Sequence, residues 1–209
     1  MALIDWTAFH FLNDLLIGHA LIGDELEDFT FWSVPALAAA TVGLWLVSRP
    51  GAVSRWRLAA ASAVASAGLA LLTNQVISHI WHRARPTEAH ADAHLWFVHA
   101  SHDPSFPSDH AAASFAIAVS VLLVSRRAGA AFLVAAAAIS VTRVLVGLHY
   151  PGDVLGGALV GTAAALAVHH LARRPLGGVV RALGRVTDPL LAPVWRLGGS
   201  RGYPKRPLT

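Results

Sequence analysis

The sequence predicts an all-α membrane protein, a bundle of about five transmembrane helices with a sixth possible. Of its 209 residues, 55% are hydrophobic and only 13% are charged, and the mean hydropathy is +0.54. This composition excludes an ordinary soluble domain, in which about a quarter of the residues are charged. The absence of cysteine excludes disulfide bonds and thiolate metal sites. The net charge of +4 does not indicate nucleic-acid binding, because the basic residues occupy short loops between apolar segments.

Residues 1–28 are expected to form an N-terminal interfacial helix. The segment Leu3–Leu21 is apolar in places, but four ionisable residues interrupt it: Asp5, His10, Asp14 and His19. This pattern is typical of an amphipathic helix that lies in the membrane interface or re-enters between spans, and a sixth full span is the alternative. The segment has no early Lys or Arg, so we do not expect a cleaved signal peptide.

Residues 29–173 are expected to form a transmembrane catalytic bundle, because a spanning helix needs roughly 20 mostly apolar residues. Five segments approach this length: Phe29–Val47, Leu58–Trp81, Asp109–Val124, Ala128–Leu148 and Asp153–Leu171. Residues 174–209 are rich in Arg and Gly and are expected to be a cytoplasmic tail that can contact anionic lipid headgroups.

The distribution of charge predicts the orientation of the bundle. Arg and Lys are concentrated at one end: Arg49, Arg55, Arg57, Arg126, Arg127 and the tail from Arg173 to Arg206. That end should be cytoplasmic by the positive-inside rule. At the outer end the only basic residues are Arg83, Arg85 and Arg143. Because positive charge is disfavoured there, these three arginines indicate an anion-binding site.

Two outer clusters carry candidate phosphate ligands. The first is the segment His79–Pro86, in which Arg83 and Arg85 can clamp phosphate oxygens. In the second, Ser108 and Asp109 begin a helix whose free backbone N–H groups favour a phosphate. His110 lies beside that position and can donate a proton to a departing oxygen.

The third outer cluster, Arg143–Asp153, carries a candidate nucleophile. Arg143 can bind a phosphoryl group with two charged hydrogen bonds, and a neutral His149 can attack phosphorus. Asp153 follows His149 by four residues and can accept the Nδ1–H, which leaves Nε2 as the nucleophile. The three clusters together therefore predict phosphoryl-transfer chemistry.

The three clusters resemble the signature of the type 2 phosphatidic acid phosphatase superfamily. Its usual motifs are Lys-x6-Arg-Pro, Pro-Ser-Gly-His and Ser-Arg-x5-His-x3-Asp, and the matching residues here are Arg85-Pro86, Pro107–His110, and Arg143 with His149 and Asp153. The resemblance implies a phosphohistidine intermediate on His149, no metal and no cofactor, and a lipid phosphate substrate. It implies that His110 is the acid, and that Arg85, Ser108 and Arg143 bind phosphate.

The sequence departs from this signature at three positions. Ser78 stands where the first motif has Lys, and Arg83 is the residue that can replace that cation. Asp109 stands in place of Gly, and Thr142 in place of Ser. With the short chain and the pair Asn74-Gln75, the Phe-Pro-Ser-Asp-His-Ala form of the second motif is most similar to the bacitracin-resistance type of undecaprenyl-diphosphate phosphatase.

The expected function is removal of the terminal phosphate of undecaprenyl diphosphate, which recycles the carrier lipid of the cell wall. The site would face the outer side of a bacterial inner membrane. Phosphatidate, phosphatidylglycerol phosphate and lipid A are alternative substrates, because the motifs recognise phosphate and not the lipid tail. A lipid-binding relative without catalysis is a further alternative, since the first motif is incomplete.

A metal-binding transporter or sensor is an alternative of another class. The loop before the second cluster is rich in imidazole and carboxylate, which are ligands for zinc or nickel. Its candidate ligands are His90, Asp92, His94, His99, His102 and Asp103.

Overall fold

The computed structural model describes residues 2–17, 20–48, 55–96 and 103–197, and within these ranges the chain is helical with no strand. The main helices are α1 (Ala2–Asp14), α2 (Ala20–Leu46), α3 (Arg55–Ile80), α5 (Asp109–Leu122), α6 (Arg126–Leu145), α7 (Pro151–Ala167) and α8 (Arg173–Leu197). A short helix, α4 (Pro86–Ala89), follows α3, and a π-helical turn (Val168–Ala172) joins α7 to α8. The prediction of an all-α membrane bundle is confirmed.

Four of the described helices are long and apolar enough to cross a membrane: Asp28–Leu46, Arg55–Ile80, Arg126–Leu145 and the continuous helix Pro151–Pro193. The remaining expected span, α5, has only 14 residues, so it is about 21 Å long. The hydrocarbon core is about 30 Å thick. Residues 103–108, which directly precede α5, are not helical, and Ser105, Pro107 and Ser108 among them are buried. The entrance to α5 therefore lies inside the bundle.

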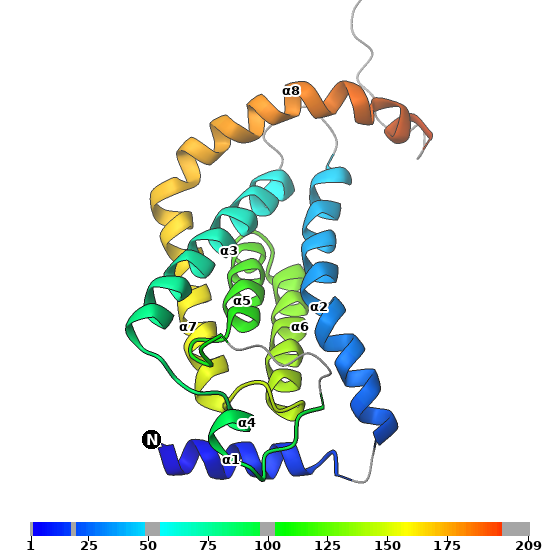
Figure 1. The fold of residues 1–209 in the computed structure, drawn as a ribbon. Coiled ribbons are helices and arrows are strands. Elements are labelled where there is room, and N and C mark those ends of the chain that lie inside the picture. Colours follow the sequence, from blue (N-terminus) through cyan, green and yellow to red (C-terminus); the bar gives the residue numbers. More distant parts are fainter. Residues whose placement is uncertain (1, 18–19, 49–54, 97–102, 198–209) are drawn as a thin grey trace, which may run out of the picture.

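The centre of the bundle is α5, which packs between α3, α6 and α7 (Figure 1). Ten of its fourteen residues are buried, and half of these are alanine. Helix α7 approaches it closely because Gly157 and Gly161 have no side chain. A Cβ on these glycines would come within 2.3 Å of the Ser108 carbonyl oxygen and 2.2 Å of the Ala112 carbonyl oxygen, respectively. Small residues therefore set the spacing of the central helices.

Two helices lie across the ends of the bundle (Figure 1). Helix α1, in dark blue, crosses the end at which α3 finishes and α7 begins, and α8 crosses the opposite end. Asn13 of α1 donates to the carbonyl oxygens of His94 and Leu145, and its Oδ1 accepts from the His94 backbone N–H. The expected N-terminal segment 1–28 does not end at a helix boundary, because α2 already begins at Ala20.

Candidate active site

Three segments that are far apart in the sequence meet where α1 packs against the bundle. The Ser105 backbone N–H donates to the Arg83 carbonyl oxygen at 2.8 Å, and the Ser108 N–H donates to the Asp153 carbonyl oxygen at 3.0 Å. The Arg85 guanidinium donates through Nη1 to the Leu148 carbonyl oxygen at 2.9 Å. Hydrogen bonds to main-chain carbonyl groups therefore bring the three clusters together.

His149 is buried, with 3% of its surface exposed. Its Nδ1 lies 2.8 Å from the carbonyl oxygen of Ser105. Because a carbonyl oxygen only accepts, Nδ1 must carry the proton and Nε2 keeps its lone pair. The expected partner, Asp153, is farther away, since its Oδ2 lies 3.8 Å from Nδ1. The backbone of Ser105 thus fixes the tautomer that was expected from Asp153.

Asp153 is fully buried and accepts three hydrogen bonds. Arg83 donates to Oδ1 at 2.7 Å, while the Ser105 hydroxyl and the Tyr150 backbone N–H donate to Oδ2 at 2.5 and 2.9 Å. These donors compensate the burial of the carboxylate and fix its orientation. Its negative charge therefore stays close to the His149 ring.

Two buried arginines flank the histidine. Arg85 and Arg143 are each only 7% exposed, and their positive charges repel one another. Arg85 also donates through Nε to the Asp103 carbonyl oxygen at 3.0 Å, and burial lowers its pKa. Two cations buried near each other are costly unless an anion neutralises them. The arrangement suits a phosphate group.

Burial also makes His149 a neutral residue at physiological pH. Its pKa is lowered to about 4, mainly by burial and further by the positive charges of Arg143 and Arg85, while Asp153 acts in the opposite direction. A neutral imidazole with a free Nε2 lone pair is the nucleophilic form. His110 belongs to the same group, since it interacts electrostatically with Arg143, His149 and Arg85.

The second cluster has the expected place at the start of α5, where Ser108 is the N-cap residue. Its hydroxyl is buried and has no hydrogen-bond partner among the described residues. The Asp109 side chain instead faces α3 and accepts from Asn74 Nδ2 at 2.8 Å. Ser108 thus offers a donor for a substrate oxygen, whereas the Asp109 carboxylate anchors the turn to α3.

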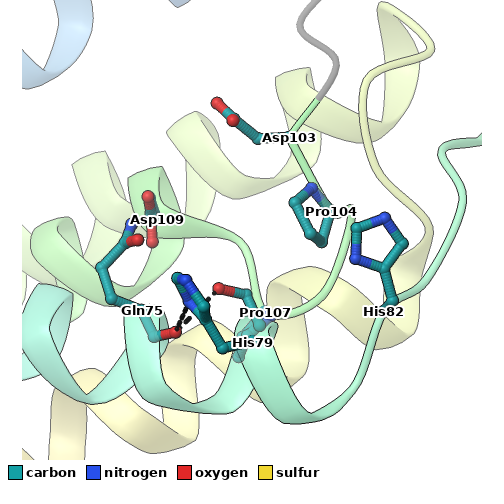
Figure 2. A pocket seen from close by; sticks show the side chains of 8 residues that line it. Gln75, His79, His82, Asp103, Pro104, Pro107 and Asp109 are labelled. Carbon is teal, nitrogen blue, oxygen red and sulfur yellow. Dashed lines mark hydrogen bonds between the residues drawn. The ribbon is translucent and has the colours of Figure 1, made fainter.

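Ser78, at the position of the missing lysine, lines a polar cavity of about 310 Å³. Figure 2 shows this cavity between the end of α3 and the segment that precedes α5. Its other lining residues are Gln75, His79, His82, Asp103, Pro104, Pro107 and Asp109, with no Arg or Lys among them. Ser78 itself donates to the Gln75 carbonyl oxygen at 3.1 Å. No permanent cation replaces the lysine among these lining residues.

Arg83 was expected to bind phosphate, but in the structure it pairs with two carboxylates. It donates to Asp153 Oδ1 at 2.7 Å and to Asp5 Oδ2 at 2.6 Å, and it lies over the Tyr150 ring. It lines a separate, apolar cavity of about 570 Å³, not the polar cavity beside Ser78. The other lining residues of this apolar cavity are Ile4, Asp5, Ala8, Trp81, Phe106, Pro151, Gly152 and Leu155.

The histidine-rich loop does not assemble a metal site within the part of the chain that is described. No group of three or more His, Asp or Glu residues there could hold a metal ion. His90 stacks on the Trp6 ring with centroids 3.6 Å apart, and Asp92 lies 3.5 Å from His10. His99 and His102 lie outside the described residues.

The sequence interpretation assigned no contact within the site to three residues that the structure places there. Ser105 contributes a carbonyl to His149 and a hydroxyl to Asp153, and Asn74 holds Asp109. Asp5 was interpreted only as a polar interruption of an interfacial helix. The available signal for Asp5 was its position. It is an acidic residue in an apolar segment, at the end of the bundle that also carries the three outer arginines.

Comparison with known proteins gives a family match and several similar proteins. Residues 59–175 match the model of the PAP2 superfamily. The chain is 29% identical over 157 residues to undecaprenyl-diphosphatase BcrC of Bacillus subtilis, covering 75% of this chain and 78% of that protein.

Two solved structures share the fold. One is LpxE of Aquifex aeolicus, with a TM-score of 0.62, 22% identity, and 76% of this chain and 90% of that chain covered. The other is a transmembrane PAP2-type phosphatidylglycerolphosphate phosphatase of Bacillus subtilis, with a TM-score of 0.59, 19% identity, and 82% and 85% covered.

Proposed function

The chain belongs to the PAP2 superfamily as a multi-pass membrane lipid phosphatase, and on this premise we propose that it removes the terminal phosphate of undecaprenyl diphosphate. The observation that carries the proposal is the buried, neutral His149 beside the two buried cations Arg85 and Arg143. The similarity to undecaprenyl-diphosphatase BcrC, over three quarters of the chain, supports this substrate.

In the proposed reaction, Nε2 of His149 attacks the terminal phosphorus in line, and a P–N bond forms as the bond to the bridging oxygen breaks. His110 gives its proton to the departing lipid phosphate. Water then attacks the phosphohistidine, with His110 as base, and inorganic phosphate leaves. Arg85, Arg143 and the Ser108 hydroxyl stabilise the charge on the transferring oxygens, and each such donor is worth about 3 kcal/mol.

The lipid tail is proposed to enter through the apolar cavity that α1 lines on one side. This cavity lies next to Arg83 and Asp153, and aromatic and aliphatic side chains form most of its wall. The described arginines other than Arg83, Arg85 and Arg143 lie on α3, α6 and α8 toward the opposite end. By the positive-inside rule, the active site faces the outer side of the bacterial inner membrane.

The test is phosphate release by the purified protein in detergent, with and without a strong chelator. Undecaprenyl diphosphate, phosphatidate and phosphatidylglycerol phosphate are compared at equal concentration. We expect kcat/KM for undecaprenyl diphosphate to exceed the others by about tenfold or more, the range that substrate contacts typically supply. Chelator should leave the rate unchanged. A preference for either glycerophospholipid would replace the proposed substrate, and no release from any of the three would refute the proposed function.

A further inference from the structure

Asp5 of α1 is joined to the proposed nucleophile through two successive ion pairs. Its Oδ2 accepts from Arg83 Nη2 at 2.6 Å, and Arg83 Nη1 donates to Asp153 Oδ1 at 2.7 Å. The other oxygen of Asp153 lies 3.8 Å from His149 Nδ1. The acid of an N-terminal peripheral helix is thus part of the charge network around a histidine that lies 144 residues later.

The position of Asp5 is fixed from both sides. Its Oδ1 accepts the backbone N–H of Gly152 at 2.7 Å, in the first turn of α7, where helix N–H groups lack intrahelical partners. Within α1, the neighbouring turn anchors the helix. Phe9 is fully buried and packs on Tyr150 with ring centroids 5.6 Å apart.

The ion pair between Asp5 and Arg83 preserves a net negative charge beside His149. Attack on phosphorus makes the imidazole of His149 cationic, and a nearby negative charge stabilises that product. Asp153 and Arg83 alone sum to zero, whereas Asp5, Arg83 and Asp153 together carry one negative charge. Arg83 stays protonated, because burial lowers its pKa but its hydrogen bonds and charge interactions with Asp5 and Asp153 outweigh that and raise it.

We propose that Asp5 is a positioning residue for the phosphatase reaction, acting through Arg83 on Asp153 and so on the His149 nucleophile. This inference rests on the proposed function. It assigns α1 a part in turnover that neither the family match, which begins at residue 59, nor the three sequence motifs include.

The experiment compares Asp5→Asn with a matched control on the same helix, Asp14→Asn. Asp14 pairs with His10 at 2.7 Å, its side chain is 37% exposed, and it has no contact with Arg83 among the described interactions. Asp5→Asn is expected to lower kcat by about tenfold to a hundredfold, the cost of a misplaced reacting group. KM should change by less than about threefold, because the diphosphate is proposed to bind at Arg85 and Arg143, and Asn keeps the size of Asp in the wall of the apolar cavity. Asp14→Asn should behave like the wild type in both constants.

A double variant separates the proposed route from a general loss of structure. If Asp5 acts through Arg83, Asp5→Asn should change kcat by no more than about twofold in the Arg83→Gln background. Asp5→Glu, which keeps the charge, should recover part of the lost kcat. Equal losses from Asp5→Asn in both backgrounds would overturn the proposal, as would a kcat of Asp5→Asn equal to that of the wild type.

A measurement without substrate makes the two proposals separable. The ring ¹⁵N signals of His149, assigned by their absence in His149→Gln, should shift in Asp5→Asn and stay in place in Asp14→Asn. Unchanged His149 signals in Asp5→Asn would refute the role of Asp5. A wild-type protein without phosphatase activity would refute the proposed function instead, and the NMR comparison would still test the ion-pair route.

Discussion

At each end of the bundle, an ion pair between an arginine and an aspartate holds a peripheral helix. Only one of these two ion pairs is connected to the candidate active site. At the end of α3 that lies beneath α8, Arg57 pairs with Asp188 of α8 at 2.6 Å. Just beyond the opposite end of α3, Arg83 pairs with Asp5 of α1 at the same distance.

The remaining contacts of the two arginines differ. Arg57 donates to the Ser48 carbonyl oxygen and lies over the Trp45 and Trp195 rings. Arg83 instead donates to Asp153, whose charge lies beside His149. We therefore expect an ion pair that holds a peripheral helix to affect the chemistry only where its next contact leads to the candidate active site. Changes at the α1 end should therefore alter turnover, and changes at the α8 end should alter stability.

The largest effect is expected from His149→Ala. This change removes the nucleophile, so turnover should fall by about 10⁴-fold, comparable to the loss of a triad residue in a hydrolase. The measurement is phosphate release, together with trapping of an acid-labile phosphohistidine from ³²P-labelled substrate. His169→Gln, at the opposite end, is the matched control and should keep both. Formation of the labelled intermediate by His149→Ala would show that another residue is the nucleophile.

The pH dependence of turnover should separate His149 from an ordinary histidine. Only the neutral imidazole attacks phosphorus, and burial lowers the pKa of His149 from 6.5 to about 4. The acidic limb of kcat/KM that belongs to His149 should therefore lie near pH 4. An ordinary histidine would already have lost about 30-fold at pH 5. The control is the ionisation of the substrate phosphate, followed by ³¹P NMR. A His149 limb near pH 6.5 would contradict the buried, neutral nucleophile.

The sequence was sufficient to identify the residues that the structure brings together around His149. His149, Arg143 and Asp153 have fixed spacing along one segment, and the structure brings that segment to His110 and Arg85. Residue type carries this information, because few side chains can bind or attack phosphorus. The His149 partner could not be predicted in the same way, since a backbone carbonyl such as that of Ser105 leaves no trace in residue type.

The helices at the two ends show the same limit for the fold. The expected tail from residue 174 is a helix that continues from α7, despite Pro189 and Pro193 within it. Its position depends on the contact of Asp188 with Arg57, 131 residues earlier in the chain. Likewise, the contacts of Asp5 with Arg83 and Gly152 could not be predicted from local patterns in the first 20 residues.

The smallest effect on turnover is expected from Arg57→Gln. Arg57 is only 4% exposed, so losing its ion pair and its contacts with two indole rings should lower the free energy of unfolding. We expect a loss of about 2–3 kcal/mol, less than for a fully buried pair, because Asp188 is 28% exposed and can regain water. The measurement is the unfolding midpoint in detergent, beside kcat per folded molecule. Among the described residues no contact of Arg57 leads to His149, so kcat should stay within about twofold of the wild type. A tenfold fall in kcat in protein that remains folded would show that the α8 end is coupled to the active site as well.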